Sequence, residues 1–268
     1  MSGFIARGMT SPTPVSRGEF GADVAAPRIL ALLRKHRIKT SWFIPGHTLE
    51  TYPEICRRVF AEGHEIGHHG WTHVPPAQLT REQEQAGLER ANVQIRKLTG
   101  QNARGYRSPS WDLSLHSVEL LIERGFVYDS SMMGDDYTPY RVRRGDVIEL
   151  EKPAVFGTAT RLIEMPVSWS LDDYPHFEFI RANDWILPGL KHAGGVLENW
   201  VNDYLYMTKA TNWGVITYTF HPFVIGRGHR MVMLEKLIRK LKDNGATFMK
   251  LGDAAVEYDR RTPFKGEA

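Results

Sequence analysis

The chain has 268 residues, of which 42% are hydrophobic and 24% are charged, so it is long enough to bury a large core. Its 34 basic and 31 acidic residues nearly balance, and no run of Lys or Arg forms a basic stripe, which argues against nucleic acid or a membrane surface as a partner. No apolar run is long enough to span a bilayer, and residues 1–17 lack the apolar region of a secretion signal. The single cysteine, Cys56, can form no internal disulfide, which predicts a cytoplasmic protein.

Short β-rich runs alternate with helical patterns along the chain. In chain order we expect a helix at 24–36, a strand at 40–44, a helix at 53–62, a strand at 65–68, a helix at 81–98, a strand at 105–107, a helix at 115–123, strands at 126–129 and 162–167, a helix at 196–208, a strand at 215–220, a helix at 231–243, a strand at 247–250 and a helix at 253–260. This alternation predicts a single α/β domain over residues 1–268, with a parallel sheet closed or nearly closed into a distorted barrel. In such barrels the chemistry lies at the C-terminal ends of the strands.

The densest group of polar residues follows the expected strand 65–68. His69 and His73 are four residues apart, so both imidazoles can face one point, as Zn²⁺ or a similar ion requires of two nitrogen ligands. A catalytic metal site usually adds a carboxylate and leaves one position open for water. Ordinary polar residues on a loop are the alternative interpretation of this pair.

Two further polar clusters also lie at the ends of expected strands. Arg107 precedes a rigid turn through Ser108 and Pro109, which suits a cation fixed above a pocket, although a buried structural arginine is equally compatible. His221 ends the expected strand 215–220 and could act as a general acid, because its unperturbed pKa is about 6.5. A histidine that only caps a strand is the alternative.

In order and spacing, these three clusters resemble motifs of the polysaccharide deacetylase (NodB homology) family, over nearly the whole chain. The resemblance implies a metal-dependent hydrolase of amide bonds, with a divalent ion, zinc as the first choice, bound by His69 and His73. It implies that Arg107 steadies the catalytic base and that His221 is the catalytic acid. It also implies a homo-oligomer.

Finer features resemble the branch that contains cyclic imidases, allantoinase-like proteins and peptidoglycan deacetylase-like proteins. They include the segments 44–47, 107–111, 128–132, 134–136 and 164–169. The residues that this resemblance implies at the substrate are Ser108, Pro109, Trp111, Trp169 and Asp172, while Asp129 would orient a nearby catalytic group.

An aromatic wall and a small enclosed pocket favour a compact cyclic imide or amide as substrate. An N-acetylated sugar, such as a chitooligosaccharide or peptidoglycan, is the alternative substrate. A catalytically impaired binding protein is the alternative from a different class.

One family feature has no counterpart in the sequence. The first motif of the family is a strand that ends in two aspartates, one the general base and the other the third metal ligand, whereas Glu19 and Asp23 end no apolar strand. We therefore expect a barrel that lacks its first strand, with unpaired edges on that strand's two neighbours. The simplest explanation is a start codon assigned too late, at an internal methionine, and an inactive, shortened homologue is the alternative.

Overall fold

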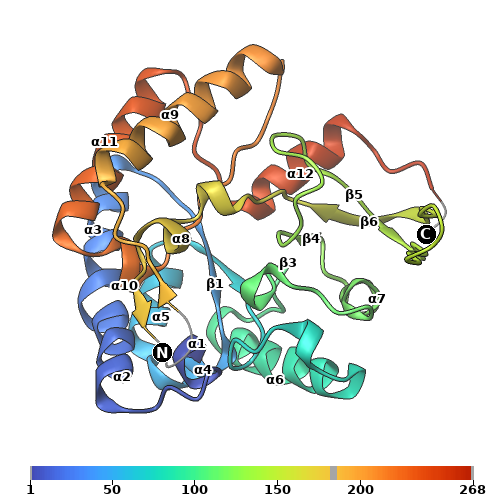
Figure 1. Ribbon diagram of the computed structural model, residues 1–268, viewed down its shortest axis with the longest axis horizontal. Helices are drawn as coiled ribbons and strands as arrows, with labels where there is room; N and C mark the ends of the chain where they lie inside the picture. The colour runs from blue at the N-terminus through green and yellow to red at the C-terminus, as the bar shows by residue number, and fades with distance from the viewer. Residues whose placement is uncertain (1, 182–185, 267–268) are drawn as a thin grey trace.

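The computed structural model describes residues 2–181 and 186–266, in which helices surround one open sheet (Figure 1). The sheet has the order β1-β2-β3-β4-β6-β5. Its members are β1 (Ser41–Ile44), β2 (Glu65–His68), β3 (Gly105–Tyr106), β4 (Tyr128–Asp129), β5 (Tyr140–Arg144) and β6 (Thr158–Glu164). Neighbouring strands are parallel except β5, which pairs antiparallel with β6. The predicted α/β class with a mainly parallel sheet is therefore confirmed.

Helices cover the sheet, and loops join the elements. The helices are α1 (Ser2–Ile5), α2 (Pro12–Glu19), α3 (Ala26–His36), α4 (Gly46–Thr51), α5 (Pro53–Ala61), α6 (Arg81–Thr99), α7 (Ser117–Glu123), α8 (Asp173–Phe177), α9 (Ala193–Ala210), α10 (Pro222–Ile225), α11 (Gly228–Asp243) and α12 (Leu251–Arg261). A small hairpin, β7 (Ile180–Arg181) with β8 (Ile186–Leu187), lies apart from the main sheet. None of the described helices combines the length and the apolar character needed to cross a bilayer.

The N-terminal stretch before residue 24, for which no helix or strand was predicted, is helical. Proline stands in the first turn of both α2 and α3, where its missing N–H costs no hydrogen bond. A π-helical segment, Phe20–Ala25, joins these two helices and packs against α10 (Figure 1). The composition of this stretch therefore misled the prediction, because Gly, Ser and Pro suit helix starts as well as loops.

Two predicted strands, 215–220 and 247–250, are not strands in the structure. Residues 215–220 make one isolated bridge, between Thr219 and Asp172, and residues 247–250 make none in the described part of the chain. A strand needs a hydrogen-bonded partner, and no backbone–backbone hydrogen bond joins β1 to 247–250 within the described ranges. A β1 side chain instead contacts the residue after this segment, since the Leu251 N–H at the start of α12 donates to Ser41 Oγ at 2.8 Å. We call the gap between β1 and the segments 214–220 and 245–250 the open seam.

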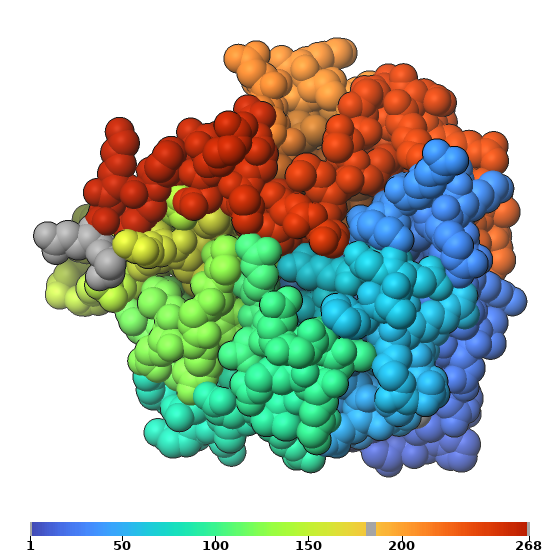
Figure 2. Space-filling model, turned by 180° about the vertical axis from the view of Figure 1, so that it is seen from behind, coloured from blue at the N-terminus to red at the C-terminus, as the bar shows by residue number. Residues whose placement is uncertain are grey.

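The apolar core of the described residues consists of three clusters, and two of them include side chains from both sides of the open seam, Trp42 with Ile216 in one and Phe43 with Val215 in the other. One cluster, with Leu121 and Tyr106 among its fully buried members, packs α5, α6 and α7 against the sheet. Another, centred on Trp200, packs α3, α9 and α11 together on the far side. Figure 2 shows from behind that the C-terminal helices lie beside the N-terminal third of the chain. The open seam therefore lies between these two groups of helices, and the site forms along it.

Candidate active site

A cavity of about 800 Å³ opens at the C-terminal ends of the strands and continues along the open seam. Its deep part is apolar, with Trp42, Ile216 and Phe248 among its lining residues. Its outer part receives most of the residues singled out in the sequence. They are His69, His73, Arg107, Trp111, Trp169, Asp172 and His221. Side chains from four distant segments of the chain thus meet at one cavity.

His69 and His73 stand on the loop that leaves β2. Their ring centroids are 4.8 Å apart and the rings are nearly perpendicular, at 81°. His69 Nδ1 donates to the Arg107 carbonyl at 2.7 Å, which leaves Nε2 with a free lone pair. The loop can fold this tightly because Gly70 has a φ of +66°, whereas His73 adopts a left-handed φ of 64° at a cost in strain.

Both imidazoles are neutral at physiological pH. Burial, with the neighbouring His73 ring as a second cause, lowers the pKa of His69 well below its ordinary value. Burial also lowers the pKa of His73 to about 4, with the His221 charge adding to the effect. Neutral imidazole is the form that binds metal ions, so both side chains are in the required state.

Arg107 follows β3 and joins the sheet to the open seam. Its Nε donates to the Ser130 carbonyl at 2.9 Å and its Nη2 to Ser130 Oγ at 2.6 Å. Its Nη1 donates across the seam to Thr219 Oγ1 at 3.2 Å, and the guanidinium lies 4.5 Å from the centre of the Phe43 ring. These contacts use the planar fork of arginine and hold a buried positive charge at the cavity wall.

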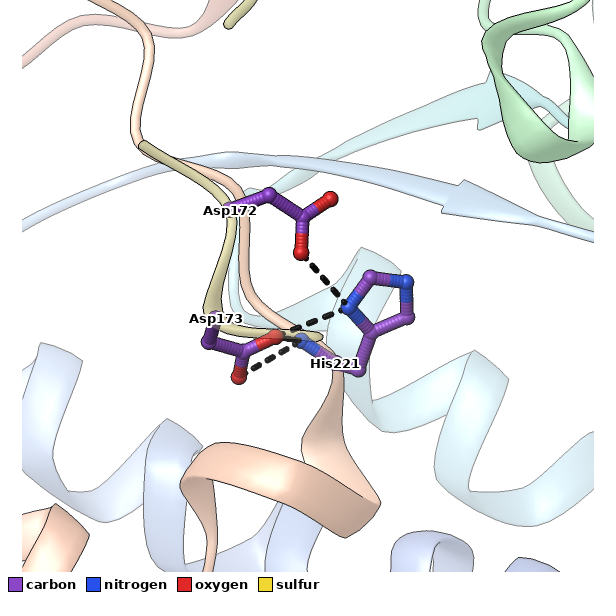
Figure 3. Close-up of side chains that lie close together, drawn as sticks. All are labelled: Asp172, Asp173 and His221. Carbon is purple, nitrogen blue, oxygen red and sulfur yellow. Dashed lines mark hydrogen bonds and ion pairs between the residues drawn. The ribbon is translucent and has the colours of Figure 1, made fainter. Parts of the chain in front are cut away.

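His221 is oriented by two consecutive aspartates (Figure 3). Its Nδ1 donates to Asp173 Oδ1 at 2.8 Å and lies 3.5 Å from Asp172 Oδ1. Its backbone N–H also donates to Asp173, at 3.0 Å. Figure 3 shows the other ring nitrogen pointing away from both carboxylates, and His221 lines the cavity. Asp172 is held in turn by the Tyr174 N–H at 2.7 Å, as the N-cap of α8.

These carboxylates decide the charge of His221. Burial opposes the protonated ring, but the Asp172 charge and the Asp173 hydrogen bond outweigh it and raise the pKa of His221 to about 8. The imidazolium form therefore persists at neutral pH, so His221 holds a proton that it can donate. Asp173 is one residue whose role was not predicted from the sequence. No local pattern marks it, because its partner lies 48 residues further along the chain.

An aromatic pair stands at the outer part of the cavity. The rings of Trp111 and Trp169 are 4.3 Å apart and inclined by 34°, and Trp169 remains 44% exposed. The turn that carries Trp111 is strained, since Ser110 and Trp111 have φ values of 59° and 52°. Left-handed backbone at ordinary residues costs about 1–3 kcal/mol each and is common at functional sites.

Three predicted site residues lie behind the cavity wall rather than on it. Ser108 and Asp129 are completely buried, Pro109 is also buried, and none of them is among the lining residues. The Ser108 N–H donates to Ser131 Oγ at 2.9 Å, and Asp129 accepts from the same hydroxyl at 2.7 Å. In this structure Ser108 and Pro109 carry the turn from which Trp111 projects, and their contact with substrate stays a prediction.

The residues present match a metal site in part. Two neutral imidazoles, of which His69 has its tautomer fixed by the Arg107 carbonyl, suit two positions of a tetrahedral zinc site, which usually has three protein ligands when catalytic. Within the described ranges, the group of potential ligand atoms that come together is Asp172, Asp173 and His221, and it does not include His69 or His73. Asp173 already accepts from His221, and no described carboxylate completes the pair of histidines.

A mainly parallel α/β fold with histidines and an arginine at its strand ends provides the acid–base groups that a hydrolase uses. The sequence profile described as polysaccharide deacetylase matches residues 19–128. A peptidoglycan deacetylase from Helicobacter pylori is 35% identical over 96% of this chain and 92% of its own length. The chain therefore belongs to the polysaccharide deacetylase family and is an amide hydrolase, as the sequence analysis predicted.

Solved structures agree on the fold. A structure described as a polysaccharide deacetylase from Mycobacterium smegmatis superposes with a TM-score of 0.81, at 27% identity, over 96% of this chain and 86% of that one. The PuuE allantoinase has a TM-score of 0.76 at 22% identity, over 93% of this chain and 77% of its own, and shows the fold alone. The predicted NodB-type fold is confirmed by these likenesses.

Proposed function

We propose that the protein removes acetyl groups from N-acetylated sugars of the peptidoglycan type by hydrolysing the acetamide C–N bond. The arrangement of His221 carries this proposal, because its Nδ1 is held by Asp173 while the other nitrogen is free for the cavity. The Helicobacter pylori relative supports a sugar substrate, since it is a peptidoglycan deacetylase by name and aligns over nearly the whole chain.

The residues of this chain fit the second half of such a reaction. After water adds to the acetamide carbon, the C–N bond breaks only when the nitrogen receives a proton. His221 donates that proton from Nε2 and becomes neutral, which releases an amino sugar and acetate. Arg107 lies on the same wall and supplies a fixed positive charge where negative charge develops on the carbonyl oxygen.

We propose that a divalent ion, zinc first, is held by the imidazoles of His69, through its free Nε2, and His73. When bound, it would supply a Lewis acid for the carbonyl and lower the pKa of water. Asp172 is the carboxylate that the described residues contribute to the cavity wall, and its contacts direct it to His221 and α8 rather than to this pair. We therefore expect weaker metal binding than a site with three protein ligands has.

The cyclic imide that the sequence analysis favoured has less support than the sugar. The Trp111–Trp169 pair is compatible with a compact ring, but the likeness to an allantoinase extends to the fold alone. The cytoplasmic location still rests on the single buried cysteine, Cys56, and the homo-oligomer on the family resemblance, so both stay predictions.

The test compares substrates and one variant pair. We expect the zinc-supplemented protein to release acetate from an oligomer of N-acetylglucosamine and to leave a cyclic imide unopened. His221→Ala should lower the rate by about 10²–10⁴-fold, the usual contribution of a general acid. His116→Ala, which removes an exposed imidazole, should leave the rate unchanged. Binding of the oligomer without acetate release would instead favour the impaired binding protein.

A further inference from the structure

Two acidic side chains are buried side by side behind the cavity wall. Asp129 ends β4 and Glu164 ends β6, and the two residues are register partners in the parallel sheet. Both have no solvent exposure. The buried guanidinium of Arg107 makes its hydrogen bonds to Ser130 and Thr219 and not to either carboxyl group. Two full negative charges in this position would be very costly.

The hydrogen bonds of the pair leave one oxygen of each group without a donor. Glu164 Oε1 accepts from the backbone N–H groups of Ser131 and Met132, at 2.8 and 2.9 Å. Asp129 Oδ1 accepts from Ser131 Oγ at 2.7 Å. Asp129 Oδ2 and Glu164 Oε2 are buried and receive no hydrogen bond from the part of the chain that the structure describes. A proton placed between these two oxygens would satisfy both at once.

We propose that Asp129 and Glu164 share a single proton, carried on Glu164 Oε2 and donated to Asp129 Oδ2, and that this pair positions the turn at 107–111. Its importance for catalysis rests on the proposed function, whereas the shared proton itself does not. Glu164 is neutral in this arrangement, and Asp129 carries the one negative charge.

Electrostatics support this assignment of the proton. Burial, and then the negative charge of Asp129 and the proposed hydrogen bond to it, raise the pKa of Glu164 well above its ordinary value. Burial also raises the pKa of Asp129, but the proposed hydrogen bond from Glu164 and the one from Ser131 oppose that rise. The other titratable groups that face the pair are Arg107 and Tyr106 beside or on β3 and Tyr140 on β5.

The pair reaches the active site through Ser131. The Ser131 hydroxyl donates to Asp129 and accepts from the Ser108 N–H, so it fixes the start of the turn that carries Trp111. The adjacent Ser130 binds the guanidinium of Arg107 and donates its own hydroxyl to the Met165 carbonyl at 2.7 Å. The segment between the two acids therefore holds both the turn and the cation. Asp129 and Glu164 are positioning residues, since neither lines the cavity.

Infrared spectroscopy of the full chain at pH 8 tests the shared proton directly. We expect the C=O band of a protonated carboxyl group in the wild type and its loss in Glu164→Gln. The control, Glu178→Gln, alters another buried glutamate that is paired with Arg17, and it should keep the band. A wild-type protein without the band would overturn the proposal, as would a band that survives Glu164→Gln.

A rescue experiment tests the positioning role. Glu164→Gln keeps an acceptor for Ser131 and Met132 and an N–H for Asp129, so we expect nearly wild-type thermal stability and kcat. Glu164→Ala removes all three partners and should lower both. Equal losses in the two variants would overturn the neutral state of Glu164. Equal kcat at unequal stability would show that the pair does not position the turn. If the chain releases no acetate, the infrared band and the stability of both variants still decide the shared proton.

Discussion

Similar sequences form strands in the main sheet, β1 to β6, but not along the open seam. We call the sheet and the helices packed on it the paired half. Residues 215–220 are as apolar and β-branched as those of β1, yet β1 pairs with β2 and 215–220 form no strand. The paired half fixes its site residues through the backbone, since the Arg107 N–H donates to the His68 carbonyl at 3.0 Å. On the seam, a side chain fixes the site residue instead, because the Asp173 carboxylate orients His221. A segment with high strand propensity thus forms a strand only where a partner strand is available to pair with it.

The largest expected difference between the two regions is in packing. Leu121→Ala, in the core behind the paired strands, should lower the free energy of unfolding by about 2–5 kcal/mol, because it opens a cavity in a filled region. Ile216→Ala should cost less than half as much, because Ile216 already borders the cavity along the seam. Urea unfolding of both variants measures this. Equal losses would show that the seam is packed as well as the sheet.

Arg107 is the side chain that bridges the two regions. Arg107→Lys keeps the charge but cannot form the fork that joins Ser130 to Thr219, so we expect a loss of about 1–3 kcal/mol in stability. The rate of acetate release should fall with it. Arg104→Lys, an exposed change just before β3, is the matched control. If both lysine variants unfold at the same urea concentration, the bridge contributes nothing.

The Asp173 carboxylate beside His221 should set the pH above which activity falls. A general acid with a pKa raised to about 8 stays protonated below that pH, so activity should fall as the pH rises through 8. Asp173→Asn keeps an oxygen for the His221 N–H but removes the charge, and should move this limit down by roughly 1 pH unit. NMR titration of His221 and the pH–rate profile both measure the shift. If the pH at which activity falls is the same in Asp173→Asn and the wild type, a group other than His221 controls it.

The smallest expected effect concerns a single methyl group. Gly195 lies inside α9 with open space around the position of a Cβ, so Gly195→Ala should stabilise the protein by about 0.5–1 kcal/mol. Gly105→Ala on β3 should destabilise it, because the added Cβ would lie 1.9 Å from Cζ of Tyr128. Thermal melts compare the two. A neutral Gly105→Ala would mean that the paired strands are less tightly packed than described.

The sequence predicted the paired strands and the chemistry at their ends better than the seam. Helical periodicity located α3, α5, α6, α9 and α11, and the rings of His69 and His73, whose spacing allows both to face one point, have centroids 4.8 Å apart. It missed β5, whose segment Tyr-Arg-Val-Arg-Arg is as charged as an edge strand is expected to be. It placed strands at 215–220 and 247–250 because propensity carries no information on whether a partner is present.

The active site shows the same limit. Arg107, His221, Trp111 and Trp169 follow from motifs and come together at the cavity. The roles of Asp173, Ser131 and Glu164 depend on contacts between residues 23 to 48 positions apart, which no local pattern encodes.

Metal binding by two variants tests the central claim, that the paired half holds a metal and the seam supplies the acid. The zinc content and acetate release of wild type, His69→Ala and His221→Ala should be measured on the same samples. We predict that His69→Ala loses both zinc and activity, while His221→Ala keeps its zinc and loses activity. Zinc retained in His69→Ala, or undiminished turnover in His221→Ala, would contradict this division of roles.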